Sequence, residues 1–181
     1  EALRQQIELA RAADEIGVNG AYFRVHHFAP QGSSPMPILS AIAASTKNIE
    51  VGTGVIDLRY ENPLYLAEEA AALDLIAEGR VALGVSRGSP EPAERGWEAF
   101  GYRGGQANGA DMARKKFELF MAAVRGAGVA RSASLEEQYP ALYKPGIPLP
   151  VFPQSPGLER RIWWGSGSHK TAEQAAREFP E

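Results

Sequence analysis

The sequence predicts an α/β fold built on a parallel sheet. Segments with helical periodicity alternate with short apolar runs, and the first strands follow one another about thirty residues apart, as in βαβ units. The run at 81–85 is apolar and partly β-branched, which is typical of a strand buried on both faces. An open doubly wound sheet and a (β/α)8 barrel share this pattern. The lack of a Gly-x-Gly-x-x-Gly fingerprint weakens the first, and a barrel with four strands would be incomplete.

Each predicted element depends on a local signal. Apolar residues recur at helical spacing, and glycines stop the helices. Asn62-Pro63, for example, is an N-cap and first-turn pair, and Gly79 ends the helix that it opens. Helices are expected at 2–16, from Ser34-Pro35, from Asn62 to Gly79, at 111–125 and from about Thr171, and strands at 21–25, 49–56, 81–85 and 161–164.

The stretch 127–160 departs from this alternation. It carries six prolines between Pro140 and Pro156 and no clear helical or strand periodicity. Connections of this length in compact domains are usually functional, so we predict that it forms a lid over the site. The chain is therefore expected to be a single domain over 1–181 with a Pro-rich insertion at about 127–160.

Composition limits the classes of function. A formal net charge of −3 gives no basic footprint for nucleic acid or an anionic membrane. The absence of cysteine excludes disulfides, thiolate metal sites and a cysteine nucleophile, and it fits a cytoplasmic protein. No apolar run is long enough to span a bilayer, and no cluster of ligand-type residues predicts a metal site. We therefore expect a small-molecule partner and no metal, membrane or nucleic-acid partner.

Two loops at the expected carboxyl ends of strands have the composition of an anion site. In Ser86-Arg87-Gly88 the glycine lets backbone N–H groups approach a ligand, and the arginine fork matches phosphate oxygens. The loop 165–168 precedes a helix N-terminus, where free N–H groups and the helix dipole also favour a phosphate. A solvated arginine in an ordinary turn and a simple N-cap at Ser168 are the structural alternatives.

Polar residues also follow the first two strands. His26 and His27 are neighbours in an extended segment, so their side chains point to opposite sides. One is expected to face the pocket as acid, base or donor while the other packs or caps a loop; two structural histidines are the alternative. Gly54 lies within the second strand and indicates a bulge or a close approach. Asp57 and Arg59 either line a substrate mouth or form a solvated rim with an internal ion pair.

Taken in order, these stretches resemble the bacterial luciferase-like monooxygenases, which are flavin-dependent (β/α)8 proteins. The resemblance covers nearly the whole chain. The matching stretches are 24–29 (RVHHFA), 51–56 (VGTGVI), 57–63 (DLRYENP), 84–91 (GVSRGSPE) and 161–168 (RIWWGSGS). The resemblance implies a partial TIM barrel with about four strand–helix units, without the family's first strand and last three units. The chain is thus expected to be a fragment of a longer protein.

The resemblance also implies roles for individual residues. His26 matches the active-site histidine beside the flavin ring, and Ser86 matches a residue at the reactive edge of the ring, so these two are the catalytic candidates. Val25 stands where many relatives have a glutamate. The candidates for binding the cofactor are Gly54 and Val55, at a non-prolyl cis peptide against the ring, and Arg87, Ser166, Gly167 and Ser168, around the phosphate.

The activity that the resemblance implies is a flavin-dependent monooxygenase. Reduced flavin, normally FMN, would react with O2 and oxygenate a small organic substrate. Two alternatives stay open: hydride transfer that depends on the deazaflavin F420, and a truncated relative that binds flavin without turnover. The resemblance further implies a homodimeric parent protein and a flavin reductase as a transient partner.

Overall fold

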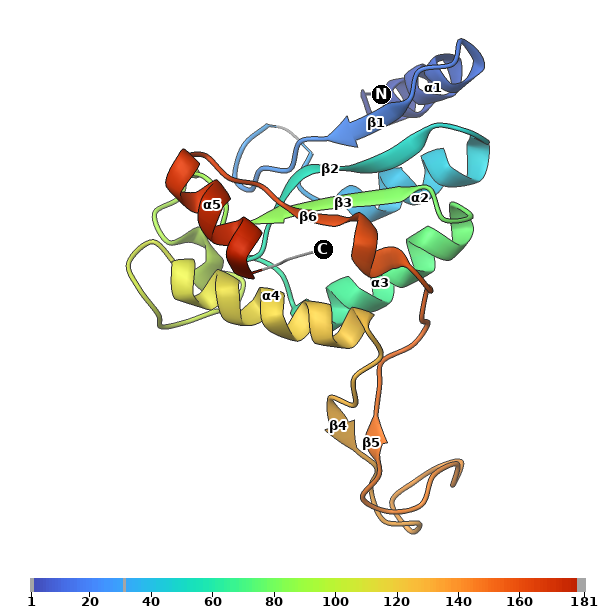
Figure 1. Cartoon of the computed structure of the whole chain (residues 1–181), viewed down its shortest axis with the longest axis vertical. Coiled ribbons are helices and arrows are strands. Elements are labelled where there is room, and N and C mark those ends of the chain that lie inside the picture. Colours follow the sequence, from blue (N-terminus) through green and yellow to red (C-terminus); the bar gives the residue numbers. More distant parts are fainter. Residues whose placement is uncertain (1, 31, 179–181) are drawn as a thin grey trace.

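The computed structural model describes residues 2–30 and 32–178, and its centre is a four-stranded parallel sheet (Figure 1). The strand order is β1-β2-β3-β6, so neighbours in the sheet follow the order of the chain. All three pairings are parallel. The strands are β1 (Gly20–Phe23), β2 (Glu50–Asp57), β3 (Val81–Ser86) and β6 (Ile162–Trp164). The predicted parallel α/β fold is confirmed.

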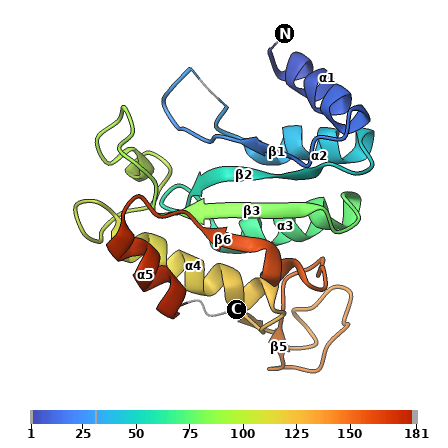
Figure 2. The same ribbon diagram turned by 45° about the horizontal axis from the view of Figure 1, so that its top comes forward.

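Three helices cover a single face of the sheet, as Figure 2 shows. They are α2 (Pro35–Ser45), α3 (Pro63–Ile76) and α4 (Ala110–Val124), and they pack side by side in that order. Their apolar residues form one core with the strand residues that point toward them, such as Leu83 and Val85. A doubly wound sheet carries helices on both faces, whereas a barrel has them only outside. The sheet is therefore an arc of a (β/α)8 barrel.

The other face of the sheet, which lies inside the arc, combines small residues with aromatic rings. A Cβ at Gly52 would lie 1.8 Å from the Ala82 carbonyl oxygen, and one at Gly84 would lie 2.3 Å from the Trp163 ring. Glycine is needed at both positions because a backbone or a ring lies directly over them. Tyr22 and Trp163 cover this face and are themselves half-exposed.

The remaining helices flank the arc. Helix α1 (Ala2–Glu15) packs on α2, and α5 (His169–Glu178) follows β6 near the amino-terminal end of α4 (Figure 1). Helix α5 begins two residues before the expected Thr171, because Ser168 and Thr171 exchange hydrogen bonds there in a capping arrangement. Two short 3-10 helices lie at Gly96–Glu98 and Leu158–Arg161. Within the described ranges no helix has the length and apolarity to cross a membrane.

The Pro-rich stretch 127–160 does not form the lid that we expected. It carries two short antiparallel strands, β4 (Ala130–Arg131) and β5 (Pro148–Leu149), which project away from the sheet (Figure 1). The stretch leaves the carboxyl end of α4 and returns to the start of β6, and a connection from a helix to the next parallel strand runs at the amino ends of the strands. Ligands in this fold bind at the opposite, carboxyl ends. Its position after a helix thus makes the lid prediction wrong.

A buried cluster of charged and polar groups holds the end of this stretch against the sheet. The Asp74 side chain, on α3, is fully buried and accepts hydrogen bonds from both Arg161 guanidinium nitrogens, at 2.6 and 2.8 Å. Ser155 Oγ donates to the same carboxylate at 2.6 Å, and the Val81 amide donates at 3.2 Å. Burial by itself raises the pKa of Asp74, but the hydrogen bonds from Arg161 and Ser155 outweigh it and the pKa is lowered. This cluster connects α3, β3 and the 3-10 helix that directly precedes β6.

Candidate active site

A cavity of about 710 Å³ opens at the carboxyl ends of the strands. Its volume lies within the range of about 300–1,000 Å³ that is usual for small-molecule and cofactor sites. Its walls come from the ends of all four parallel strands and from α4 and α5. The side chains and loops that follow the strands therefore converge on one space, as the parallel topology requires.

The cavity gathers nearly all of the residues that the sequence had marked. The lining includes His26, Gly54, Val55, Asp57, Ser86, Arg87, Ser166, Gly167 and Ser168. The peptide bond between Gly54 and Val55 is cis, as the resemblance implied. Arg59 is the exception, because it does not line the cavity. The catalytic and binding roles of the lining residues stay predictions.

The two adjacent histidines point to different places, which confirms the expectation from the extended backbone. His26 lines the cavity; its Nδ1 lies 3.0 Å from Glu91 Oε1, and its Nε2 accepts a hydrogen bond from Arg24 Nε at 2.7 Å. His27 is buried and stacks on the Tyr60 ring with 4.1 Å between ring centroids. Burial lowers the pKa of His27. His27 is thus a packing residue, and His26 is the one available for chemistry.

The loop after β3 is shaped by a turn at Gly88. The Gly88 amide donates to Ser86 Oγ at 2.8 Å, and Gly88 has a φ of +78°, where side chains are unfavourable. A Cβ at this position would also lie 1.9 Å from Asp57 Oδ2. Ser86 is buried, whereas Arg87 is exposed at the cavity. The turn thus places Arg87 at the cavity lining.

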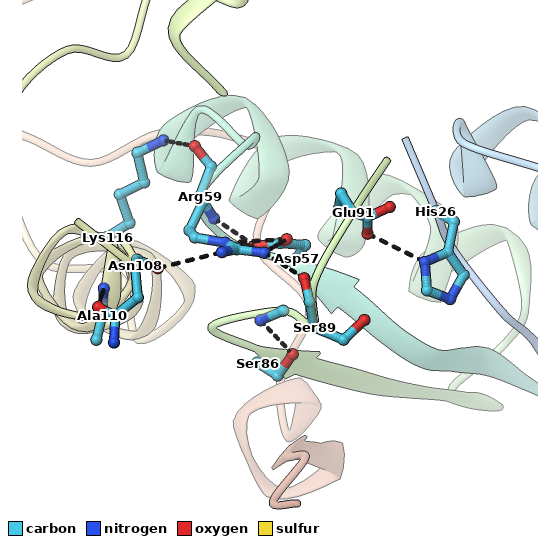
Figure 3. Close-up of polar contacts among 10 residues, drawn as sticks. His26, Asp57, Arg59, Ser86, Ser89, Glu91, Asn108, Ala110 and Lys116 are labelled. Atoms are coloured by element: carbon cyan, nitrogen blue, oxygen red, sulfur yellow. Dashed lines mark hydrogen bonds and ion pairs between the residues drawn. The ribbon is translucent and has the colours of Figure 1, made fainter. Parts of the chain in front are cut away.

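The ion pair of Asp57 and Arg59 supports the loop after β3, as Figure 3 shows. The Arg59 side chain is buried, and its Nη2 lies 2.6 Å from Asp57 Oδ2. Arg59 Nη2 also donates to the Ser89 carbonyl oxygen at 2.7 Å, and Arg59 Nη1 donates to the Asn108 carbonyl oxygen at 3.1 Å. The Arg59 guanidinium is thus engaged inside the protein, and the predicted substrate contact of Arg59 gains no support from the cavity lining. One of the two expected arrangements was a solvated rim with an internal ion pair. The ion pair is present, but it is buried and not exposed to solvent.

The loop after β6 forms the opposite wall. The Gly165 amide donates to the Val85 carbonyl oxygen at 2.8 Å, which extends the β3–β6 pairing into the loop. A Cβ at Gly165 would approach Val55 to 3.0 Å, so the loop and the cis peptide lie close together. Ser168 Oγ lies 3.0 Å from Thr171 Oγ1 and caps α5. Its hydroxyl is thus already engaged, and the backbone of this loop is what remains for a ligand.

The cavity lining carries both arginines and acidic residues. Arg24, Arg87 and Arg114 line it, together with the acidic residues Asp57 and Glu91. Asp57 is paired with Arg59 outside the lining, and Glu91 lies against His26. Arg87, which is exposed at the cavity, can thus provide positive charge to a phosphate. Among residues 2–30 and 32–178 no group of three or more histidines and acidic residues could hold a metal ion.

A second cavity lies beside the buried histidine and is lined by Glu61 and Glu69, among others. Burial raises the pKa of the Glu61 carboxyl to about 7, and the charge of Glu69 adds to this shift, while Lys116 opposes it. Burial also lowers the pKa of Lys116 to about 8. The Lys116 ammonium donates to the Arg59 carbonyl oxygen at 2.8 Å (Figure 3). A charged Glu61 is therefore costly in the folded state.

We expect Glu61→Gln to raise the free energy of unfolding at pH 8 by about 1–3 kcal/mol. A carboxyl whose pKa is raised on folding stabilises the fold fully below its ordinary value of 4.5, and this contribution is lost as the pH rises through about 7. Glutamine stays neutral at every pH. Urea unfolding of both proteins at pH 5 and pH 8 tests this, and an equal gain at the two pH values would show that packing, not titration, is responsible.

A barrel arc with a cavity at the carboxyl ends of its strands is the arrangement in which (β/α)8 proteins bind their ligands. The chain belongs to the luciferase-like monooxygenase family, whose model matches residues 1–179. It is 38% identical over 90 residues to the 4-hydroxyprotoasukamycin monooxygenase of Streptomyces nodosus subsp. asukaensis, which is 49% of this chain and 24% of that protein. It is 34% identical over 87 residues to the oxygenase component of the flavin-dependent trigonelline monooxygenase of Acinetobacter baylyi, covering 47% and 24%.

The fold agrees with this assignment. The monooxygenase RslO1 from Streptomyces bottropensis superposes with a TM-score of 0.74 at 22% identity, over 96% of this chain and 50% of that one. The chain thus matches about a quarter of the length of these curated relatives and half of the solved chain. The expected partial barrel is confirmed.

Some lining residues were absent from the prediction. Arg24 is two positions before His26 in an extended segment, so the alternation of side chains could have placed both on one side. Glu91 and Arg114 also line the cavity, the first from the loop after β3 and the second from α4. No local signal pairs Glu91 with His26, because 65 residues separate them.

Proposed function

We propose that this chain forms the FMN-binding half of a flavin-dependent monooxygenase that oxygenates a small organic substrate. The observation that carries the proposal is that one cavity brings together two unlike sets of residues. Arg87 and the loop before α5 offer donors to an anion, and the Gly54–Val55 peptide, His26 and Ser86 line the same space. A planar ring that carries a phosphate on a flexible chain requires both.

The residues present fit FMN. Arg87 supplies a planar donor fork for the phosphate, and Ser166 and Gly167 supply the backbone before the N-terminus of α5, whose dipole favours an anion. Gly54 and Val55 line the same cavity, and an isoalloxazine ring would lie against them. The reduced flavin, when bound, supplies the electrons that activate O2.

The protein's own contribution is to bind, orient and exclude water. Val25 and Trp164 are apolar parts of the lining and would limit solvent beside a bound ring. His26 offers a ring nitrogen that can accept or return a proton at the reacting centre. Ser86 Oγ accepts a hydrogen bond from the Gly88 amide, so the Ser86 O–H can still donate a hydrogen bond toward the cavity. A relative described as an oxygenase component supports a reductase as the source of reduced flavin; a homodimeric parent protein is part of the same proposal.

Titration of the chain with FMN, followed by flavin fluorescence, tests the proposal. We expect saturable binding that Arg87→Ala weakens about tenfold to a hundredfold, the effect of removing charge-assisted hydrogen bonds to a phosphate. Arg160→Ala is the matched control, because the Arg160 side chain is 86% exposed and lies outside the cavity lining. An equal loss in both variants would indicate general attraction of the anion and not a site.

Parallel measurements separate the alternatives. A preference for F420 over FMN would replace the proposal with hydride transfer. FMN binding without product formed in the presence of O2 and a reductase would identify a flavin-binding protein without turnover. A folded chain that binds neither cofactor would contradict the proposal for this polypeptide.

A further inference from the structure

Both ring nitrogens of His26 have partners, and the two partners come from different elements. Glu91 Oε1, in the loop after β3, lies 3.0 Å from Nδ1, and Arg24 Nε, just beyond β1, donates to Nε2 at 2.7 Å. Figure 3 shows Glu91 directed at the imidazole. Val25, which lies between Arg24 and His26, is apolar and buried. The carboxylate that contacts His26 thus comes from Glu91, in the loop after β3, and not from the neighbouring position.

These contacts define one protonation state of the ring. An ionised carboxylate only accepts hydrogen bonds, so Nδ1 must carry a hydrogen. A guanidinium only donates, so Nε2 must be unprotonated. An imidazolium would direct an N–H at the Arg24 guanidinium. His26 is therefore a neutral imidazole with its hydrogen on Nδ1 and its lone pair on Nε2.

The two partners differ in how firmly they are held. The Glu91 side chain is only 3% exposed, and its other oxygen, Oε2, is buried without a hydrogen-bond partner in the described part of the chain. The carboxylate is thus not occupied by backbone amides or a second cation there, and His26 is its hydrogen-bonding contact. Arg24 is exposed, so its guanidinium can be displaced at low cost. The Glu91 contact is fixed, and the Arg24 contact is exchangeable.

We propose that Glu91 is a positioning residue that fixes the His26 ring as the Nδ1–H tautomer, so that Nε2 is the proton acceptor offered to the cavity. Arg24 occupies Nε2 until a ligand donor replaces it. The inference deepens the proposed function, because it assigns the atom through which His26 acts. A carboxylate on the far nitrogen both orients an imidazole and increases its tendency to accept a proton on the near one.

The tautomer can be observed directly by long-range 1H–15N NMR of the imidazole rings in the flavin-free protein. The chain has three histidines, and substituting each in turn assigns the signals. We expect His26 to show the Nδ1–H pattern, with a preference of about tenfold or more that a hydrogen bond to a charged group supplies. An Nε2–H pattern in the unsubstituted protein would overturn the proposal without any variant.

Variants then separate the two partners. Glu91→Met should abolish the preference, since methionine offers no comparable acceptor, whereas Glu91→Gln should retain it through the amide oxygen. Arg24→Met is the matched control and should retain it as well, because Glu91 still holds Nδ1–H. Unchanged His27 and His169 signals establish that a variant is folded. A preserved preference in Glu91→Met, or its loss in Arg24→Met alone, would refute the assignment. Because no flavin is present, this result is independent of whether FMN binds.

Discussion

Arg161→Met is expected to destabilise the fold by about 3–5 kcal/mol, because it leaves the carboxylate of Asp74 buried without its cation. Asp74 is fully buried, and two of its four hydrogen-bonding partners are the guanidinium nitrogens of Arg161. Methionine fills a similar length but donates nothing. Urea unfolding at pH 7, followed by tryptophan fluorescence, measures the loss of unfolding free energy.

The pH dependence of this loss identifies its cause. In the native protein the pKa of Asp74 is lowered, so its stabilising contribution is present above its ordinary value of 3.8 and is lost as the pH falls below it. In Arg161→Met the hydrogen bonds from Ser155 and the Val81 amide remain, but the cation that chiefly opposes the effect of burial is gone, so the pKa of Asp74 rises relative to the native protein. As the pH falls, protonation of Asp74 then removes the unpaired buried charge and makes the variant less unstable. We expect the difference between the two proteins to narrow from pH 7 to pH 5.

The double variant Asp74→Asn with Arg161→Met is the control. Replacing both members of a buried pair is far less harmful than removing one, because no uncompensated charge remains. The asparagine amide oxygen can still accept from the Val81 amide, and its NH2 group can donate to Ser155 Oγ. The double variant should therefore recover much of the loss. If it were as unstable as Arg161→Met, or if the difference did not change with pH, the cost would arise from lost packing.

Much of the fold could be predicted because its signals are local. Asn62 begins α3 as expected, and its side chain accepts from the Leu64 and Tyr65 amides. The apolar run of β3 is buried along its whole length, as its composition indicated. What the residues alone left open was the architecture. An arc and a doubly wound sheet differ in which face the helices cover, and only the packing of α2, α3 and α4 on one face decides between them.

The site was predictable as far as strand ends mark it. Residues that directly follow parallel strands meet in one cavity, so His26, Ser86 and Arg87 were found from the chain order. Contacts between residues that are far apart in the sequence could not be found in this way. Arg59 follows β2 like a lining residue, yet its guanidinium turns inward to Asp57 and Ser89. This inward orientation of Arg59 depends on Gly88, since a side chain at position 88 would occupy the space of the Asp57 carboxylate.

Gly88→Ala is accordingly expected to damage stability and binding together. Its φ of +78° costs a residue with a side chain about 1–2 kcal/mol, and the new methyl group would lie 1.9 Å from Asp57 Oδ2 and 2.6 Å from Arg59 Nη2. Both charges are buried and cannot simply swing into solvent. We expect a loss of about 2–5 kcal/mol in unfolding free energy. FMN binding should weaken by about tenfold as Arg87 is displaced, and urea unfolding and FMN titration measure the two effects.

Gly17→Ala separates the two causes. Gly17 has a φ of +81°, and nothing lies within 4 Å of the Cβ that alanine would add. It carries the same backbone cost without a collision and is remote from the cavity lining. Gly17→Ala should therefore lose about 1–2 kcal/mol and bind FMN normally. If Gly88→Ala lost no more stability than Gly17→Ala and kept its FMN affinity, the Asp57–Arg59 pair would not be what holds the Arg87 loop in place.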